Sequence, residues 1–137
     1  MMLKILLWLT ATAMFAAEPV TLTIQLKGFK SDKGTVRVAL FDSEAAFPKA
    51  DKAMRKEMAN IAGGTATVVL SDLKPGTYAV AAYHDANGNG KMDTNFIGIP
   101  KEPTGVSNDA KARMGPPSFK DAKFSLTATN AITITMQ

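Results

Sequence analysis

The 137-residue chain contains no cysteine and only one histidine. Without cysteine it forms no disulfide and carries no lipid on a cysteine, so it is not a lipoprotein of that kind. A catalytic zinc site usually takes three nitrogen, sulfur or carboxylate ligands from the protein. One histidine and no cysteine would need two carboxylates converging on the same ion. The composition therefore disfavours thiol catalysis and zinc chemistry.

Long runs of one charge are also missing. The net charge is +4, but no block of five basic residues occurs, and aromatic residues do not interleave with basic ones. A surface that binds nucleic acid normally shows as a clustered basic patch. We therefore expect the basic residues to form a solvated surface, and we expect no nucleic-acid partner.

Only the first 17 residues resemble a targeting segment. Lys4 supplies a positive charge, and an apolar stretch begins at residues 5–9. Small residues suit signal-peptide cleavage at three points, after Ala13, Ala16 or Ala17. The apolar run is shorter than the roughly 20 residues of a membrane-spanning helix. We therefore expect residues 1–17 to be a signal peptide, and residues 18–137 to form one periplasmic or secreted domain without a membrane span.

Alternating apolar and polar residues dominate this domain and predict β-strands. The predicted strands are 20–26, 35–41, 65–70, 78–84, 119–126 and 132–136. Short turns between strands favour antiparallel pairing. The expected fold class is all-β, an antiparallel two-sheet β-sandwich of the immunoglobulin-like kind. Strands 20–26 and 132–136 are candidates for exposed edges that pair with another chain.

Residues 43–61 interrupt the alternation. Pro48 suits a first helical turn, alanines favour a helix, and apolar residues recur on one helical face. These apolar residues are Phe47, Met54, Met58 and Ile61. The pattern predicts one short amphipathic helical insertion. The two methionines offer soft ligands for copper, but packing onto the sheet is the simpler interpretation.

An oxygen-rich loop follows strand 78–84. Side-chain oxygens stand at alternate positions, and Gly90 permits a sharp turn. The candidate metal ligands are Asp85, Asn87, Asn89, Asp93 and the main-chain carbonyl of Lys91. This spacing matches positions 1, 3, 5, 7 and 9 of an EF-hand calcium loop, whereas Phe96 replaces the glutamate at position 12. The loop is either a calcium site or a hairpin turn in which the Asn-Gly pairs tolerate positive φ.

The segment 94–117 is the longest without periodicity, and it is rich in proline and glycine. Loops of this length in a compact domain are usually functional or disordered. Apolar residues along it favour packing over disorder, so we expect residues 98–117 to form a recognition loop beside the oxygen-rich loop.

Residues in this region resemble a bacterial family known as domain of unknown function 2141. The similar stretches are HDANGNGKMDTNFIGIPKE at 84–102, GVSN at 105–108 and GPPSF at 115–119. The preceding LKPGTY at 73–78 is similar to a turn of transthyretin-like and carboxypeptidase-regulatory-like sandwiches. The resemblance implies a secreted, transthyretin-like β-sandwich and no particular reaction.

These features favour a binding or structural protein outside the cytoplasm. Its partner would be a ligand or another cell-envelope protein, and calcium would restrain the loop 85–93. We expect no catalytic residue and no cofactor besides calcium.

The alternative is a small hydrolase-like enzyme that uses His84 as a general base. The candidate nucleophiles and orienting carboxylates are Ser107, Ser118, Asp85, Asp93 and Asp109. No nucleophile-elbow motif is present, and the adjacent strand residues His84 and Asp85 point to opposite faces. A histidine that bonds a loop carbonyl is the simpler interpretation.

Overall fold

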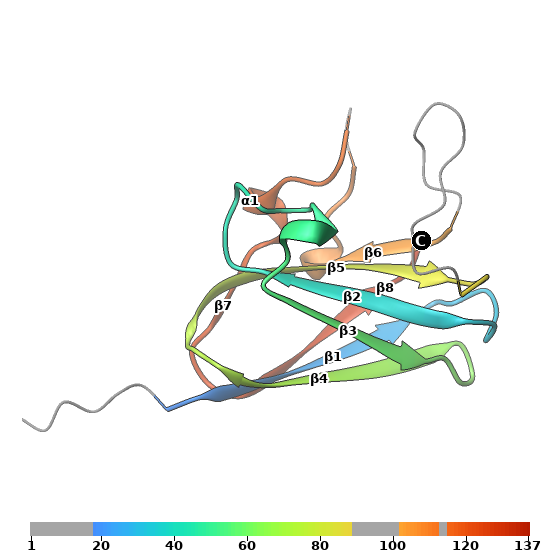
Figure 1. The fold of residues 1–137 in the computed structure, drawn as a ribbon, viewed down its shortest axis with the longest axis horizontal. Coiled ribbons are helices and arrows are strands. Elements are labelled where there is room, and N and C mark those ends of the chain that lie inside the picture. The colour runs from blue at the N-terminus through green and yellow to red at the C-terminus, as the bar shows by residue number, and fades with distance from the viewer. Residues whose placement is uncertain (1–17, 89–101, 113–114) are drawn as a thin grey trace, which may run out of the picture.

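Two β-sheets pack face to face in the computed structural model, which describes residues 18–88, 102–112 and 115–137 (Figure 1). One sheet has the strand order β4-β1-β8, and the other has the order β3-β2-β5-β6 with β7 also paired to β5. The strands are β1 (Val20–Lys27), β2 (Thr35–Phe41), β3 (Arg55–Asn60), β4 (Thr65–Leu73), β5 (Gly76–Asp85), β6 (Thr104–Val106), β7 (Phe124–Leu126) and β8 (Asn130–Thr135). The predicted all-β, two-sheet class is confirmed.

The main core lies between the two sheets. Leu22, Ile24 and Leu26 of β1 alternate with polar residues and are at most 1% exposed. Val36 and Leu40 of β2 face them from the other sheet and are fully buried. Period-two alternation puts every second side chain on one face of a strand, so the inward faces follow directly from the sequence.

Strand β1 is the central strand of its sheet, so its prediction as an exposed edge is wrong. It pairs with β4 in the antiparallel sense and with β8 in the parallel sense. The parallel pair arises because the chain crosses to the other sheet after β7 and runs as β8 in the same direction as β1. The sequence predicted mostly antiparallel pairing, and the other strand pairs are antiparallel.

The edge of β8 is protected by side chains and by a bridge to the second sheet. The Ala131 N–H donates to Asn130 Oδ1 at 2.8 Å, and the Thr135 N–H donates to Asp109 Oδ1 at 3.0 Å. Gln137 exchanges two main-chain hydrogen bonds with Thr104 of the β6 strand, at 2.8 and 3.0 Å. Because these groups already have partners, β8 offers little to a strand from another chain.

The helical insertion predicted within residues 43–61 is wrong in its position. This segment contains a 3₁₀ turn at Ala50–Lys52 and then strand β3, which pairs with β2 over six residues. Met54 and Met58, which were expected to pack inward, are 42% and 59% exposed. The charged residues of β3 suit an edge strand, because charge on an edge opposes pairing with other chains.

The short α-helix lies instead at α1 (Phe119–Ala122), inside the segment predicted as strand 119–126. Ser118 caps it by accepting a hydrogen bond from the Asp121 N–H at 3.2 Å. Only residues Phe124–Leu126 of the predicted strand pair with β5. Among the described residues, no helix is long and apolar enough to cross a membrane.

A second, smaller core covers part of the outer face of the five-stranded sheet. Phe41 is fully buried, and its ring meets Phe47 edge-on with centroids 5.2 Å apart. Phe119 of α1 meets Phe47 at 5.9 Å, and Ala39, Ala79 and Ala122 complete the buried part of the cluster. Figure 1 shows the connection between β2 and β3 and helix α1 above this face. The covering layer leaves the neighbouring part of the same face open.

Tyr78 closes the turn before β5. Its hydroxyl donates to the main-chain carbonyl of Lys74. Burial of the ring, and secondly the negative charge of Asp42, raise the pKa of Tyr78 above its ordinary value. The hydroxyl therefore stays protonated and remains a donor for this turn.

Candidate binding trough

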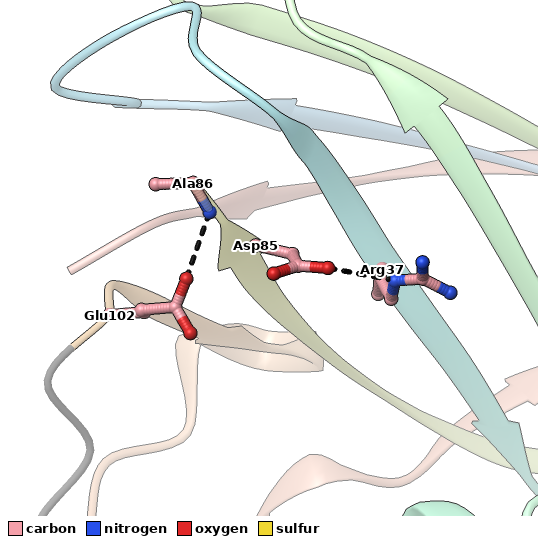
Figure 2. A network of polar contacts seen from close by, with 4 residues as sticks. All are labelled: Arg37, Asp85, Ala86 and Glu102. Carbon is pink, nitrogen blue, oxygen red and sulfur yellow. Dashed lines mark hydrogen bonds and ion pairs between the residues drawn. The ribbon is translucent and has the colours of Figure 1, made fainter. Parts of the chain in front are cut away.

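The oxygen-rich loop begins where β5 ends, on the outer face of the five-stranded sheet (Figure 2). Asp85 is fully buried, and its Oδ2 atom accepts a hydrogen bond from Arg37 Nε at 3.1 Å. The main-chain carbonyl of Asp85 accepts the Gly88 N–H at 3.3 Å, and Gly88 has a φ of +68°. The chain therefore turns directly after Asp85, whose carboxylate is already paired with the guanidinium of Arg37.

Two of the five predicted metal ligands, Asp85 and Asn87, fall in the described part of the chain. Asn89, Lys91 and Asp93 lie outside the described residues. Within the described ranges, no three histidine, cysteine or acidic residues are grouped closely enough to hold a metal ion.

The chain returns beside the start of this loop. The Ala86 N–H donates to Glu102 Oε2 at 2.8 Å, and the His84 N–H donates to the Pro103 carbonyl at 2.9 Å (Figure 2). Directly after Pro103 the chain runs as β6 along β5. The beginning of the oxygen-rich loop and the described part of the predicted recognition loop therefore lie side by side.

His84 points to the opposite face of β5, into the core between the sheets. It is 2% exposed, its Nε2 lies 2.6 Å from the Lys33 carbonyl oxygen, and Phe29 packs edge-on against the ring at 5.3 Å. The simpler interpretation of a histidine that bonds a loop carbonyl describes this geometry. The ring does not face the solvent in a position to act on a substrate.

Ser107, one of the candidate nucleophiles, is fully buried and links three segments. Its hydroxyl accepts the Val80 N–H at 2.9 Å and donates to the Ala122 carbonyl at 2.6 Å. Val80 lies on β5 between the residues paired with β6 and those paired with β7. The hydroxyl thus takes the place of the main-chain partner that neither β6 nor β7 supplies to Val80. Its proton is already donated in a hydrogen bond.

The next two residues hold neighbouring segments through their side chains. Asn108, with a φ of +60°, donates from Nδ2 to the carbonyls of Asp121 and Lys123 at 3.1 and 2.9 Å. Asp109, also at positive φ, accepts the Thr135 N–H of β8. Asparagine and aspartate tolerate this conformation better than most residues, so the Ser-Asn-Asp run carries a local signal for a turn. The distant partners of these three side chains, on β5, on β8 and in and after α1, leave no mark in the local sequence.

A concavity lies on the open part of the outer face of the five-stranded sheet. It consists of two connected hollows of about 820 and 570 Å³, which share Pro48, Ala81 and Ala82. We call this feature the trough. Its lining includes Arg37, Ala39, Pro48, Lys56, Met58, Ala81, Tyr83, Glu102, Val106, Asp109, Lys111, Pro116 and Pro117.

The floor of the trough is a single row of residues across four strands. In the strand register, Lys56 of β3 stands opposite Ala39 of β2, Ala39 opposite Ala81 of β5, and Ala81 opposite Val106 of β6. Small side chains in the middle of the row leave space above the sheet. Ala79 is buried inside the second core, whereas Ala81 packs against the edge of that core, is half-buried and also lines both hollows of the trough.

Charge is distributed unevenly along the trough. Arg37, Lys56 and Glu57 lie at the end formed by β2 and β3, and Glu102, Asp109 and Lys111 lie at the end formed by β6 and the segment after it. The middle is apolar. Described residues of the predicted 98–117 loop line one end of the trough, whereas sequence reasoning did not single out Arg37, Lys56 or the alanine floor.

The fold and this concavity define a small all-β protein with a surface trough on one sheet. The sequence matches the model of a family described as uncharacterised proteins conserved in bacteria (DUF2141) over residues 24–134. The chain therefore belongs to this bacterial family. No curated protein and no solved structure gives a significant match.

Proposed function

We propose that this protein is a binding protein outside the cytoplasm and that it holds its ligand in the trough. The observation that carries the proposal is the continuous, largely apolar concavity over Ala39 and Ala81. Ligand sites are typically concavities lined mainly by apolar groups with a few polar groups placed among them. Export is supported by the signal-like residues 1–17, so we propose a periplasmic or secreted location.

The support beneath the trough is rigid. Strands β2 and β5 pair over seven residues, and each also has a partner on its other side. Residues 104–110, which border the trough, are held by the side chains of Ser107, Asn108 and Asp109. A preformed site loses less conformational entropy when a ligand binds.

A neutral, environment-sensitive dye tests the trough directly. We expect Nile red to bind the wild-type protein with increased fluorescence. We expect Ala81→Leu to weaken binding at least about tenfold, because the larger side chain would occupy the space above the floor that the dye needs, and a ligand forced into filled space loses roughly 1–3 kcal/mol. Ala131→Leu is the matched control, because Ala131 is exposed on the outer face of the other sheet. Equal dye binding by wild type and Ala81→Leu would contradict the proposal.

We further propose that the loop 85–93 binds calcium weakly and is restrained by it beside the β6 end of the trough. The support is the alternate spacing of the candidate ligands and the position of Asp85 and Asn87 at a strand end. A restraining ion acts on a scaffold that is already folded, so an affinity typical of extracellular modules is sufficient.

Calcium should raise the melting temperature of the mature protein. With a dissociation constant of about 1 mM, 10 mM calcium adds about 1.4 kcal/mol, which corresponds to a shift of about 4 °C for a domain of this size. Asp93→Asn removes a proposed ligand and should abolish the shift, whereas Asp51→Asn, on the exposed 3₁₀ turn, should retain it. Differential scanning fluorimetry measures the melting temperature, with magnesium as the ionic control. An equal response to both metals would contradict the calcium site and leave the interpretation of residues 85–93 as a simple hairpin turn.

A further inference from the structure

We propose that the trough selects an elongated apolar ligand that ends in an anionic group, and that Arg37 with Lys56 binds this group. The inference rests on the proposed binding function and specifies its ligand class. It follows from the orientation of Arg37, from the two cations that share the outer face at one end of the trough, and from the chemistry of the floor.

Arg37 is oriented by a buried carboxylate. Its Nε donates to Asp85, which is fully buried, while the Arg37 side chain remains 38% exposed. Figure 2 shows both terminal nitrogens directed away from Asp85. A guanidinium has five N–H donors, of which only one is on Nε. In the described part of the chain, no residue accepts a hydrogen bond from the two terminal nitrogens of Arg37. The arginine is thus held in place at one atom and has its planar, two-pronged end available to a ligand.

Lys56 adds a second positive charge at this end. The charges of Arg37 and Asp85 cancel, so this pair alone would attract an anion weakly. Lys56 stands opposite Ala39 in the register, which puts it on the outer face with Arg37, whereas Glu57 stands opposite the inward-facing Val38 and also borders this hollow. Because Asp85 is engaged by Arg37 Nε and Glu57 leaves β3 on the side opposite to Lys56, the ends of Arg37 and Lys56 are the charged groups that share the outer face with an anionic ligand group.

The floor excludes a polar ligand body. Its middle consists of Ala39, which is buried, and of Ala81 and Val106, which are half-buried, and the main chain beneath them is paired within the ladders β2–β5 and β5–β6. A peptide laid across this row would lose hydrogen bonds to water without replacement, which costs free energy for each buried amide. A hydrocarbon body loses none. Four strands spaced about 4.8 Å apart give a row about 14 Å long, which fits an extended alkyl chain better than a compact molecule.

Competition against Nile red tests the head group and the body separately. The probes are decanoate, decyl phosphate, decanol and decyltrimethylammonium, all below their aggregation concentrations. We expect decanoate or decyl phosphate to displace the dye at about tenfold lower concentration than decanol, because a charge-assisted hydrogen bond to arginine is stronger than a neutral one. The tighter of the two anions identifies a carboxylate or a phosphate as the preferred head group. The cationic probe should be the weakest.

Variants assign the preference to the two basic residues. Lys56→Gln, at an exposed position, should reduce the advantage of the anion over decanol by about threefold or more, since one of two cations is lost. Arg37→Gln should remove the advantage entirely, and its circular dichroism and melting curve establish that it is folded. Lys27→Gln, on the exposed outer face of the other sheet, is the matched control and should retain the full preference.

The outcomes separate this inference from the proposed function. Nile red binding that depends on Ala81, together with equal displacement by decanol and decanoate, would overturn the anion preference while the trough remains a binding site. An anion preference unchanged in Lys56→Gln, and equal to that of Lys27→Gln, would overturn the assignment to this end of the trough. No binding of Nile red or of any amphiphile would overturn both proposals.

Discussion

Replacing Gly34 with alanine should lower the free energy of unfolding by roughly 3–5 kcal/mol. Gly34 has a φ of +68°, and a Cβ atom there would lie 2.1 Å from the Asp85 carbonyl oxygen and 2.9 Å from the carbonyl carbon of Ala86. These contacts are with main chain at the end of β5, which has no rotamer that relieves them. The turn between β1 and β2 would have to move away from the start of the oxygen-rich loop.

Gly63→Ala isolates the contribution of the contact. Gly63 has a similar φ of +62°, but a Cβ atom there meets nothing within 4 Å. This variant should cost only about 1 kcal/mol, the penalty of the left-handed conformation. Urea unfolding of both variants measures the difference, and similar losses would show that Gly34 is required for its backbone angle and not for the approach of the two segments.

Replacing Phe41 with alanine should cost about 3–5 kcal/mol, because the side chain is fully buried and leaves a cavity. Phe41 lies beneath Phe47, which is followed by Pro48, a residue that lines both hollows of the trough. The loss should therefore extend beyond stability. We expect the folded variant to bind Nile red several-fold more weakly than the wild type, since the connection that borders the trough loses its support.

Phe119→Ala is the comparison within the same cluster. Phe119 is half-buried and contacts Phe47 from helix α1, so its removal should cost about 1–2 kcal/mol, the lower range for partly buried apolar groups. Chemical unfolding with parallel dye titration measures both effects. A Phe41→Ala variant that loses stability but keeps full dye binding would show that the second core and the trough are independent.

The role of Ser107 illustrates why residue type alone misassigns function. A serine near a histidine and several aspartates in the sequence suggested a nucleophile. The fold instead puts His84 in the core between the sheets and directs the Ser107 hydroxyl at the main chain of Val80 and Ala122. Both assignments depend on contacts between residues far apart in the chain, which no local pattern encodes.

The segment 43–61 shows the limit of periodicity. Alanine and methionine are good helix formers, and their spacing fits a helix. The segment nevertheless pairs with the edge of β2 that β5 leaves open. This pairing gives the main chain of β3 hydrogen-bond partners over six residues. Tertiary pairing outweighs intrinsic propensity in such cases, because propensity differences are only tenths of a kcal/mol per residue.

The sequence by itself determined the inward faces of the long strands and the all-β class. These features follow from the local alternation of apolar and polar residues and from the glycine and proline residues of the turns, which depend only on neighbouring positions in the chain. Only the tertiary structure decided that β8 runs parallel to β1, that Arg37 meets Asp85 across two strands, and that Ala39 and Ala81 floor an open trough. Each of these depends on strand order and register, which are set by how the whole chain buries its apolar surface.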